Sequence, residues 1–195
     1  MIKNESELLR QIHEKMKKDM SQSQRLSRGN LDEDFANTMI PHHEGAVNMT
    51  RALFLLDSNA NNDLALRNLT KSVITTQPDE IVRLKKELSR LPKNYYHDPR
   101  DVHVYRRSEI EIMHKMHAKS DRTLDNVTQR SIPAVVYVDL MIPHHQAGAD
   151  LARTYLGFGT NKTMKNIAQG IIAEQKHEIR LMKLWKKNHT ALLFP

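Results

Sequence analysis

The segment Met39-Ile40-Pro41-His42-His43 returns about half a chain later as Met141-Ile142-Pro143-His144-His145. Five identical residues at this separation indicate an internal duplication, which has to be recognised before a fold is assigned. Each copy is followed by the pattern Gln-x-x-Glu-Ile, at Gln77-Pro78-Asp79-Glu80-Ile81 and at Gln175-Lys176-His177-Glu178-Ile179. The sequence therefore predicts two related repeats, residues 1–95 and 96–195.

Apolar residues recur at helical spacing through most of the chain, which predicts an all-α fold. The 195 residues include only 6 Gly and 7 Pro, and no alternating pattern indicates a strand. We expect about six main helices, three in each repeat, over residues 5–27, 32–56, 63–91, 101–130, 133–156 and 162–188.

Pro41 and Pro143 lie inside helical patterns, although proline removes a backbone hydrogen bond from a helix interior. One interpretation is that a helix begins at each proline, where the missing N–H is harmless. The other is that the helix continues through the proline with a kink. Phe35 and Met39 keep the apolar spacing ahead of Pro41, so we favour the continuous helix.

Paired histidines beside a methionine are suitable ligands for a soft or borderline metal. Imidazole binds copper, zinc, nickel and iron, and thioether sulfur favours Cu(I) or Ag(I). The chain has no Cys, which excludes thiolate sites and leaves copper as the favoured metal. The candidate ligands in the repeated segments are Met39, His42, His43 and Met49, and Met141, His144 and His145.

Two further groups of His and Met lie at helical spacing, and their function stays open between extra metal ligands and an ordinary amphipathic helix. Methionine is a common core residue without any metal, whereas His97, His103 and His189 are expected at the surface. The two groups are Met113, His114, Met116 and His117, and His13, Met16 and Met20.

The Gln-x-x-Glu-Ile segments predict partners that orient the histidines, because a ligating His usually donates its second ring N–H to a carboxylate. A purely structural His hydrogen bond to Glu80 or Glu178 is the alternative. Glu174-x-x-His177 has the spacing of carboxylate di-iron bundles and makes His177 a further candidate ligand. The first repeat has Thr76 and Asp79 in those places, so this motif is not duplicated.

Several function classes find no support in the sequence. The formal net charge is +7, but basic residues are scattered among acidic ones, so nucleic-acid binding is not expected. No apolar run is long enough to insert into a membrane, and no signal peptide is recognisable. We find no catalytic triad and no phosphate-binding loop, so we expect a protein that is not an enzyme.

The double-His segments with their downstream Gln-x-x-Glu-Ile segments resemble the bacterial family called domain of unknown function 305. The chain looks like a tandem two-domain member, similar to the periplasmic copper-binding CopM-like proteins. This resemblance implies a ferritin-like helical bundle, a periplasmic or secreted location, and copper or silver binding. It also adds Met182 as a ligand, whereas the first repeat has Leu84 at that position.

The leading hypothesis is a protein that binds Cu(I), Cu(II) or Ag(I) through His and Met for copper buffering, transport or resistance. Its expected partners are the metal ion and another copper-handling protein. Two alternatives stay open: a ferritin-like iron-dependent oxidase, and a structural or interaction module without metal.

Overall fold

The structure, a computed structural model, describes residues 2–25, 29–57, 60, 62–128 and 131–190. These residues form six α-helices and no strand, so the all-α prediction is confirmed. No helix in the described ranges is long and apolar enough to cross a membrane. The helices are α1 (Ile2–Arg25), α2 (Leu31–Leu56), α3 (Leu64–Leu88), α4 (Pro99–Asp125), α5 (Pro133–Phe158) and α6 (Lys162–Thr190).

Side-chain caps explain where several helices begin and end. The Asn30 side chain accepts hydrogen bonds from the first backbone N–H groups of α2, as expected for an N-cap. We expected α4 to extend to Arg130, but it ends at Asp125 because the Asn126 side chain donates to the Arg122 carbonyl at 2.8 Å. Arg130 itself lies outside the described residues.

We expected His97 at the surface, and this prediction is wrong because the residue is half-buried at the start of α2. Its Nδ1 accepts a hydrogen bond from the Leu31 backbone N–H at 3.1 Å. One of the free donors at the beginning of the helix is thereby satisfied. A histidine distant in sequence thus serves as a second cap of α2.

Pro41 and Pro143 both lie within continuous helices, as does Pro78 in α3. α2 passes through Pro41 and α5 passes through Pro143. The interpretation that a helix begins at each proline is therefore wrong and the helices are continuous, whereas the kink at each proline stays a prediction. Proline does begin α5 at Pro133, where its fixed φ suits the first helical turn.

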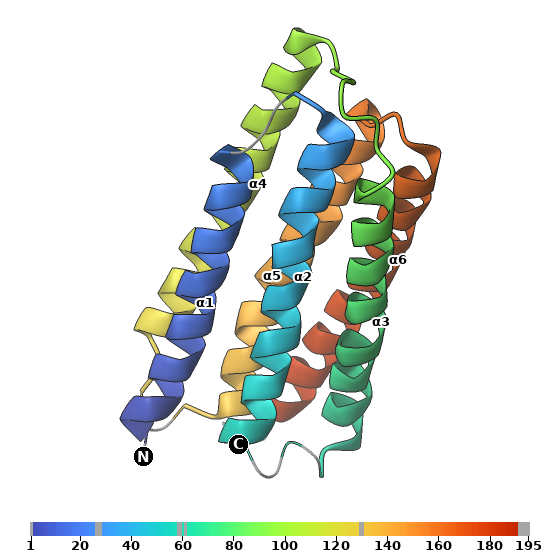
Figure 1. Cartoon of the computed structure of the whole chain (residues 1–195). Helices are drawn as coiled ribbons and strands as arrows, with labels where there is room; N and C mark the ends of the chain where they lie inside the picture. The colour runs from blue at the N-terminus through green and yellow to red at the C-terminus, as the bar shows by residue number, and fades with distance from the viewer. Residues whose placement is uncertain (1, 26–28, 58–59, 61, 129–130, 191–195) are drawn as a thin grey trace.

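The six helices form three neighbouring pairs (Figure 1). α2 and α5 lie in the middle and run in opposite directions, with α1 and α4 on one side and α3 and α6 on the other. Each pair takes one helix from each repeat. The double-His segments, which lie near the middle of α2 and α5, are thereby placed at the centre of the molecule.

The apolar core consists of two clusters, and each contains residues of both repeats. One includes Phe35 and Tyr155, whose rings stack at 4.1 Å. The other includes Leu53 and Tyr137. Along α2 the first cluster ends at Ile40 and the second begins at Ala46. The division into residues 1–95 and 96–195 stays a prediction about the repeats, because the core joins both.

Asp32 ties α2 to the turn between α5 and α6. Its buried carboxylate accepts hydrogen bonds from the Tyr155 hydroxyl at 2.6 Å, the Thr160 N–H at 2.9 Å and hydroxyl at 2.7 Å, and the Asn161 N–H at 3.1 Å. Burial raises the pKa of Asp32, but these hydrogen bonds outweigh it and hold the pKa below its usual value. The carboxylate is therefore charged and fully partnered at neutral pH.

Candidate metal centre

The two double-His segments meet in the interior between the apolar clusters. His42, His43, His144 and His145 are all at most 1% exposed. Neutral imidazole is a metal ligand, and buried imidazole needs a partner for each polar nitrogen. The hydrogen bonds of the four rings therefore decide which nitrogens are available to a ligand.

The rings of His42 and His144 stack at the centre of the molecule. Their centroids are 3.7 Å apart and their planes differ by 29°. The His42 Nε2 lies 3.0 Å from the His144 backbone carbonyl. A carbonyl only accepts, so this Nε2 carries the proton, and in a neutral ring the His42 Nδ1 has a free lone pair.

The remaining nitrogens of this pair have no hydrogen-bond partner. The His42 Nδ1 and both ring nitrogens of His144 are buried without one. Burial holds the pKa of both histidines well below the usual value, reinforced by the neighbouring histidines. The stacked pair thus presents neutral imidazoles with unused lone pairs.

Each outer histidine of the cluster pairs with the glutamate of its own repeat. The His43 Nε2 lies 2.8 Å from a Glu80 carboxylate oxygen, and the His145 Nε2 lies 2.8 Å from a Glu178 oxygen. The predicted contact between histidine and the Gln-x-x-Glu-Ile segment is confirmed in both repeats. The Nδ1 atoms of both rings are buried without a partner.

The Glu178 carboxylate is held in its charged form. Burial raises its pKa, but the hydrogen bonds that it accepts from His145 and Ser72 help to bring the pKa below the usual value. Ser72 also donates to Glu178 at 2.7 Å. A charged, accepting carboxylate places the ring proton on the His145 Nε2 and leaves its Nδ1 for a ligand.

Two glutamines add polar atoms to this interior. Gln77 and Gln175 are each 1% exposed, and neither side-chain amide has a hydrogen-bond partner. At Gly148 an added Cβ would lie 2.2 Å from the Gln175 Oε1 and 2.8 Å from the His42 Cε1. The amide and the ring both approach the backbone of α5 closely, and the absence of a side chain at Gly148 leaves room for them.

The methionines lie on both sides of the histidine cluster. Met39 packs in the first apolar cluster with Leu84, whereas Met141 packs in the second with Met49 and Met182. All of these methionines are at most 2% exposed. The second cluster thus holds three of these methionines, whereas the first holds Met39 and has Leu84 at the position that corresponds to Met182.

The other candidate ligands do not join the central cluster. His177 is exposed, and its Nδ1 lies 3.4 Å from an Arg180 guanidinium nitrogen. Glu174 is exposed as well, so the Glu-x-x-His spacing lies on the outer face of α6. Met113 and Met116 are buried in the first apolar cluster, and His114 of the same turn is exposed.

His117 contacts the first repeat instead. Near this contact lies Asp121, which the sequence analysis missed. Its ring meets that of His13 edge to face, with centroids 5.4 Å apart. Asp121, one turn further along α4, lies 3.0 Å from the His13 Nε2. The spacing His117-x-x-x-Asp121 on one helix face was the available signal.

The four central histidines do not place three nitrogen or carboxylate ligand atoms within 4.8 Å of one another in the described residues. Within the described ranges, only His13, Glu14 and Asp121 place three nitrogen or carboxylate ligand atoms within 4.8 Å of one another. The central cluster offers imidazole nitrogens, and buried methionines lie on both sides of it. The carboxylates of Glu80 and Glu178 are already hydrogen-bonded to His43 and His145. This combination suits a soft ion better than a hard one.

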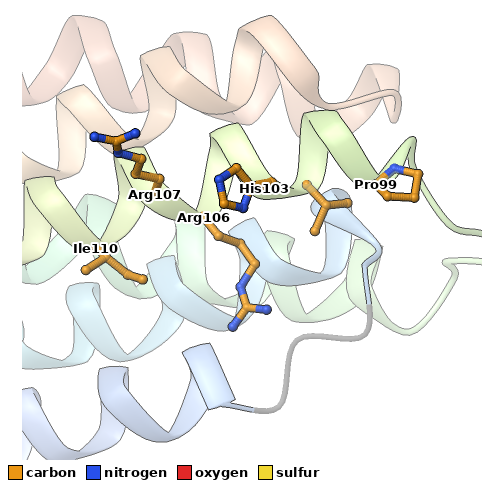
Figure 2. A pocket seen from close by; sticks show the side chains of 6 residues that line it. Pro99, His103, Arg106, Arg107 and Ile110 are labelled. Carbon is orange, nitrogen blue, oxygen red and sulfur yellow. The ribbon is translucent and has the colours of Figure 1, made fainter.

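A surface hollow of about 440 Å³ lies away from this interior (Figure 2). It opens on the outer side of α4 and contains none of the four central histidines. Its lining residues are Pro99, Val102, His103, Arg106, Arg107 and Ile110.

The family described as Domain of unknown function (DUF305) matches residues 4–88 and residues 32–186. Together the matches cover most of the chain and include both double-His segments. The chain belongs to this family. No curated protein and no solved structure matches the chain. Membership in DUF305 places the double-His motif in a known sequence family without assigning a ligand to it.

Proposed function

We propose that this protein binds copper, as Cu(I) or Cu(II), or silver, at the buried histidines of α2 and α5. One observation carries the proposal: His42 and His144 stack in the core while three of their four ring nitrogens have no partner. Buried polar atoms are normally satisfied. An imidazole that is neutral, buried and unpartnered is suited to donate its lone pair to a metal.

The nearby thioethers favour copper or silver over zinc. Met39 and Met141 each lie about one helical turn before the two histidines of their own segment, and both are fully buried. Thioether ligands suit Cu(I) and Ag(I), whereas protein zinc sites use Cys, His and Asp or Glu ligands. The resemblance to tandem, periplasmic CopM-like copper proteins agrees with this chemistry. We further propose an exported, non-enzymatic copper buffer or carrier that delivers its ion to another copper-handling protein.

An anaerobic Cu(I) titration against a competing chromophoric chelator tests the proposal. The informative variant is H42F/H144F, because phenylalanine keeps an aromatic ring at each position but offers no lone pair. We expect the wild-type chain to retain at least one Cu(I) and the variant to lose an ion or bind it about tenfold or more weakly. His103→Ala, on the exposed face of α4, is the matched control.

The pH dependence separates imidazole from thioether ligation. Protonated histidine cannot bind a metal, so imidazole ligation weakens in acid, whereas a site of thioethers alone is comparatively insensitive. Met141→Leu and Met182→Leu, which nearly conserve volume, should weaken Cu(I) binding at neutral pH. Equal copper capacity and affinity in the wild type and in H42F/H144F would contradict the assignment.

A structural role without metal is the competing interpretation, and the His43–Glu80 and His145–Glu178 pairs favour it. Such pairs also occur in bundles as buried hydrogen bonds with no ligand. In that case neither copper nor silver would raise the melting temperature, since only a ligand of the folded state does so.

A further inference from the structure

A second cluster of ligating side chains lies between α1 and α4 and shares no residue with the four central histidines. One ligand atom each of His13, Glu14 and Asp121 lies within 4.8 Å of the other two. The His117 ring packs against the His13 ring at 5.4 Å. The cluster therefore brings two imidazoles and two carboxylates together from both repeats.

The chemistry of this cluster differs from that of the proposed copper site. Zinc is bound by His nitrogen and by Asp or Glu oxygen, at about 2.0–2.2 Å in tetrahedral sites. Neighbouring ligand atoms in such a site are roughly 3.3 Å apart. A small inward shift of the exposed Glu14 side chain would bring the ligand atoms of this cluster to that spacing. His13 is 1% exposed and the Asp121 side chain is 40% exposed, which leaves the cluster a route to solvent.

A cation already lies between the carboxylates. The Lys17 Nζ is 3.2 Å from an Asp121 oxygen and 3.2 Å from a Glu14 oxygen. The His117 Nδ1 is buried without a hydrogen-bond partner. The position thus attracts positive charge and has an unused imidazole nitrogen beside it.

The imidazoles need not lose a proton before they bind. Burial, reinforced by His13, lowers the pKa of His117 to about 4. Burial also lowers the pKa of His13, although Asp121 opposes the shift. Both rings are neutral at pH 7, the form that a metal requires.

We propose that His13, His117, Asp121 and Glu14 form a second metal site, for a divalent ion of the zinc class, that links α1 of the first repeat to α4 of the second. The bound ion displaces the Lys17 ammonium from the carboxylates. This site is independent of the proposed copper site, because it shares no ligand with the central histidines.

Zinc titration of the full chain, by calorimetry or against a chromophoric chelator, tests this site. We expect one Zn²⁺ whose affinity falls by about tenfold or more in Asp121→Asn and in His117→Gln. His103→Gln, which removes an exposed histidine elsewhere on the same helix, should leave that affinity unchanged. Lys17→Met should raise the affinity several-fold, because the competing ammonium is gone.

Two further measurements test whether the zinc ion binds at this cluster and not at the central histidines. The H42F/H144F variant should retain this zinc ion, which distinguishes the site from the central one. Zinc should raise the melting temperature of the wild type but not of Asp121→Asn, since the ion joins α1 to α4 only in the folded state. Unchanged zinc affinity in both Asp121→Asn and His117→Gln, with circular dichroism showing intact helices, would overturn the proposal.

Discussion

At the scale of single residues, the stacked histidines differ in how their nitrogens are used. His42 donates through Nε2 to the His144 carbonyl, whereas neither nitrogen of the His144 ring has a partner. Removing the His144 ring nitrogens therefore breaks no side-chain hydrogen bond in the described structure. Replacing His43 would instead leave the buried Glu80 unpaired, which is costly. Variants at His144 thus report on ligand binding with the least structural damage.

The metal-free protein should lose stability as the pH falls below about 6.5. Burial keeps the pKa of His42 and His144 well below the usual value in the folded state, so the unfolded chain takes up protons that the folded chain does not. Each histidine then costs on the order of 1 kcal/mol between pH 7.5 and 5.5. Urea unfolding at both pH values should show a smaller acid loss in H42F/H144F, and an identical loss would contradict the expectation.

Gly148→Ala should be destabilising, by about 1–3 kcal/mol. The new Cβ would crowd the Gln175 amide and the His42 ring, and only the amide end can move aside easily. Gly170→Ala in α6 is the matched control, because its added Cβ meets nothing within 4 Å. We expect this control to stabilise by about 0.5–1 kcal/mol. Thermal unfolding of both variants decides the point, and equal melting temperatures would count against the close approach at Gly148.

At the scale of helices and turns, Asp32 shows how one side chain positions elements distant in sequence. It is one of three acidic residues in the first turn of α2, yet its hydrogen bonds go to Tyr155 and to the turn between α5 and α6. That turn sets the start of α6, which carries Gln175 and Glu178 toward the central histidines.

Asp32→Ala should therefore cost about 3 kcal/mol or more, since it leaves several buried donors without an acceptor. Asp98→Ala is the control, because Asp98 caps α4 at an exposed position and an N-cap is worth about 1 kcal/mol. The free energies of unfolding in urea compare the two directly. A loss at Asp32 no larger than that at Asp98 would show that the turn holds without this carboxylate.

At the scale of the whole molecule, the two repeats share one core. Both apolar clusters contain side chains of each repeat, such as Phe35 with Tyr155 and Leu53 with Tyr137. A repeat alone would leave the apolar face of α2 in water.

A fragment of residues 1–95 should therefore fail to fold as a stable monomer. We expect helical content without a cooperative thermal transition, or association into oligomers, as measured by circular dichroism and light scattering. Adding the fragment of residues 96–195 should restore a cooperative transition. A monomeric first repeat that melts cooperatively on its own would contradict the shared core.

The sequence by itself determined the helices and the candidate residues, because apolar periodicity and capping are local along the chain. It placed helices at α2 and α5, identified the duplication, and paired each double-His segment with Glu80 or Glu178. The end of α4 was predicted less accurately, because the Asn126 side chain bonds one of its last backbone carbonyls.

Only the tertiary structure decided which residues meet across the repeats. The stacking of His42 on His144, the exposure of His177, and the contact of His13 with His117 and Asp121 depend on how the helix faces turn toward one another. That rotation is settled by the packing of the whole core, in which each side chain fills space left by many others, and no short segment of sequence contains this information.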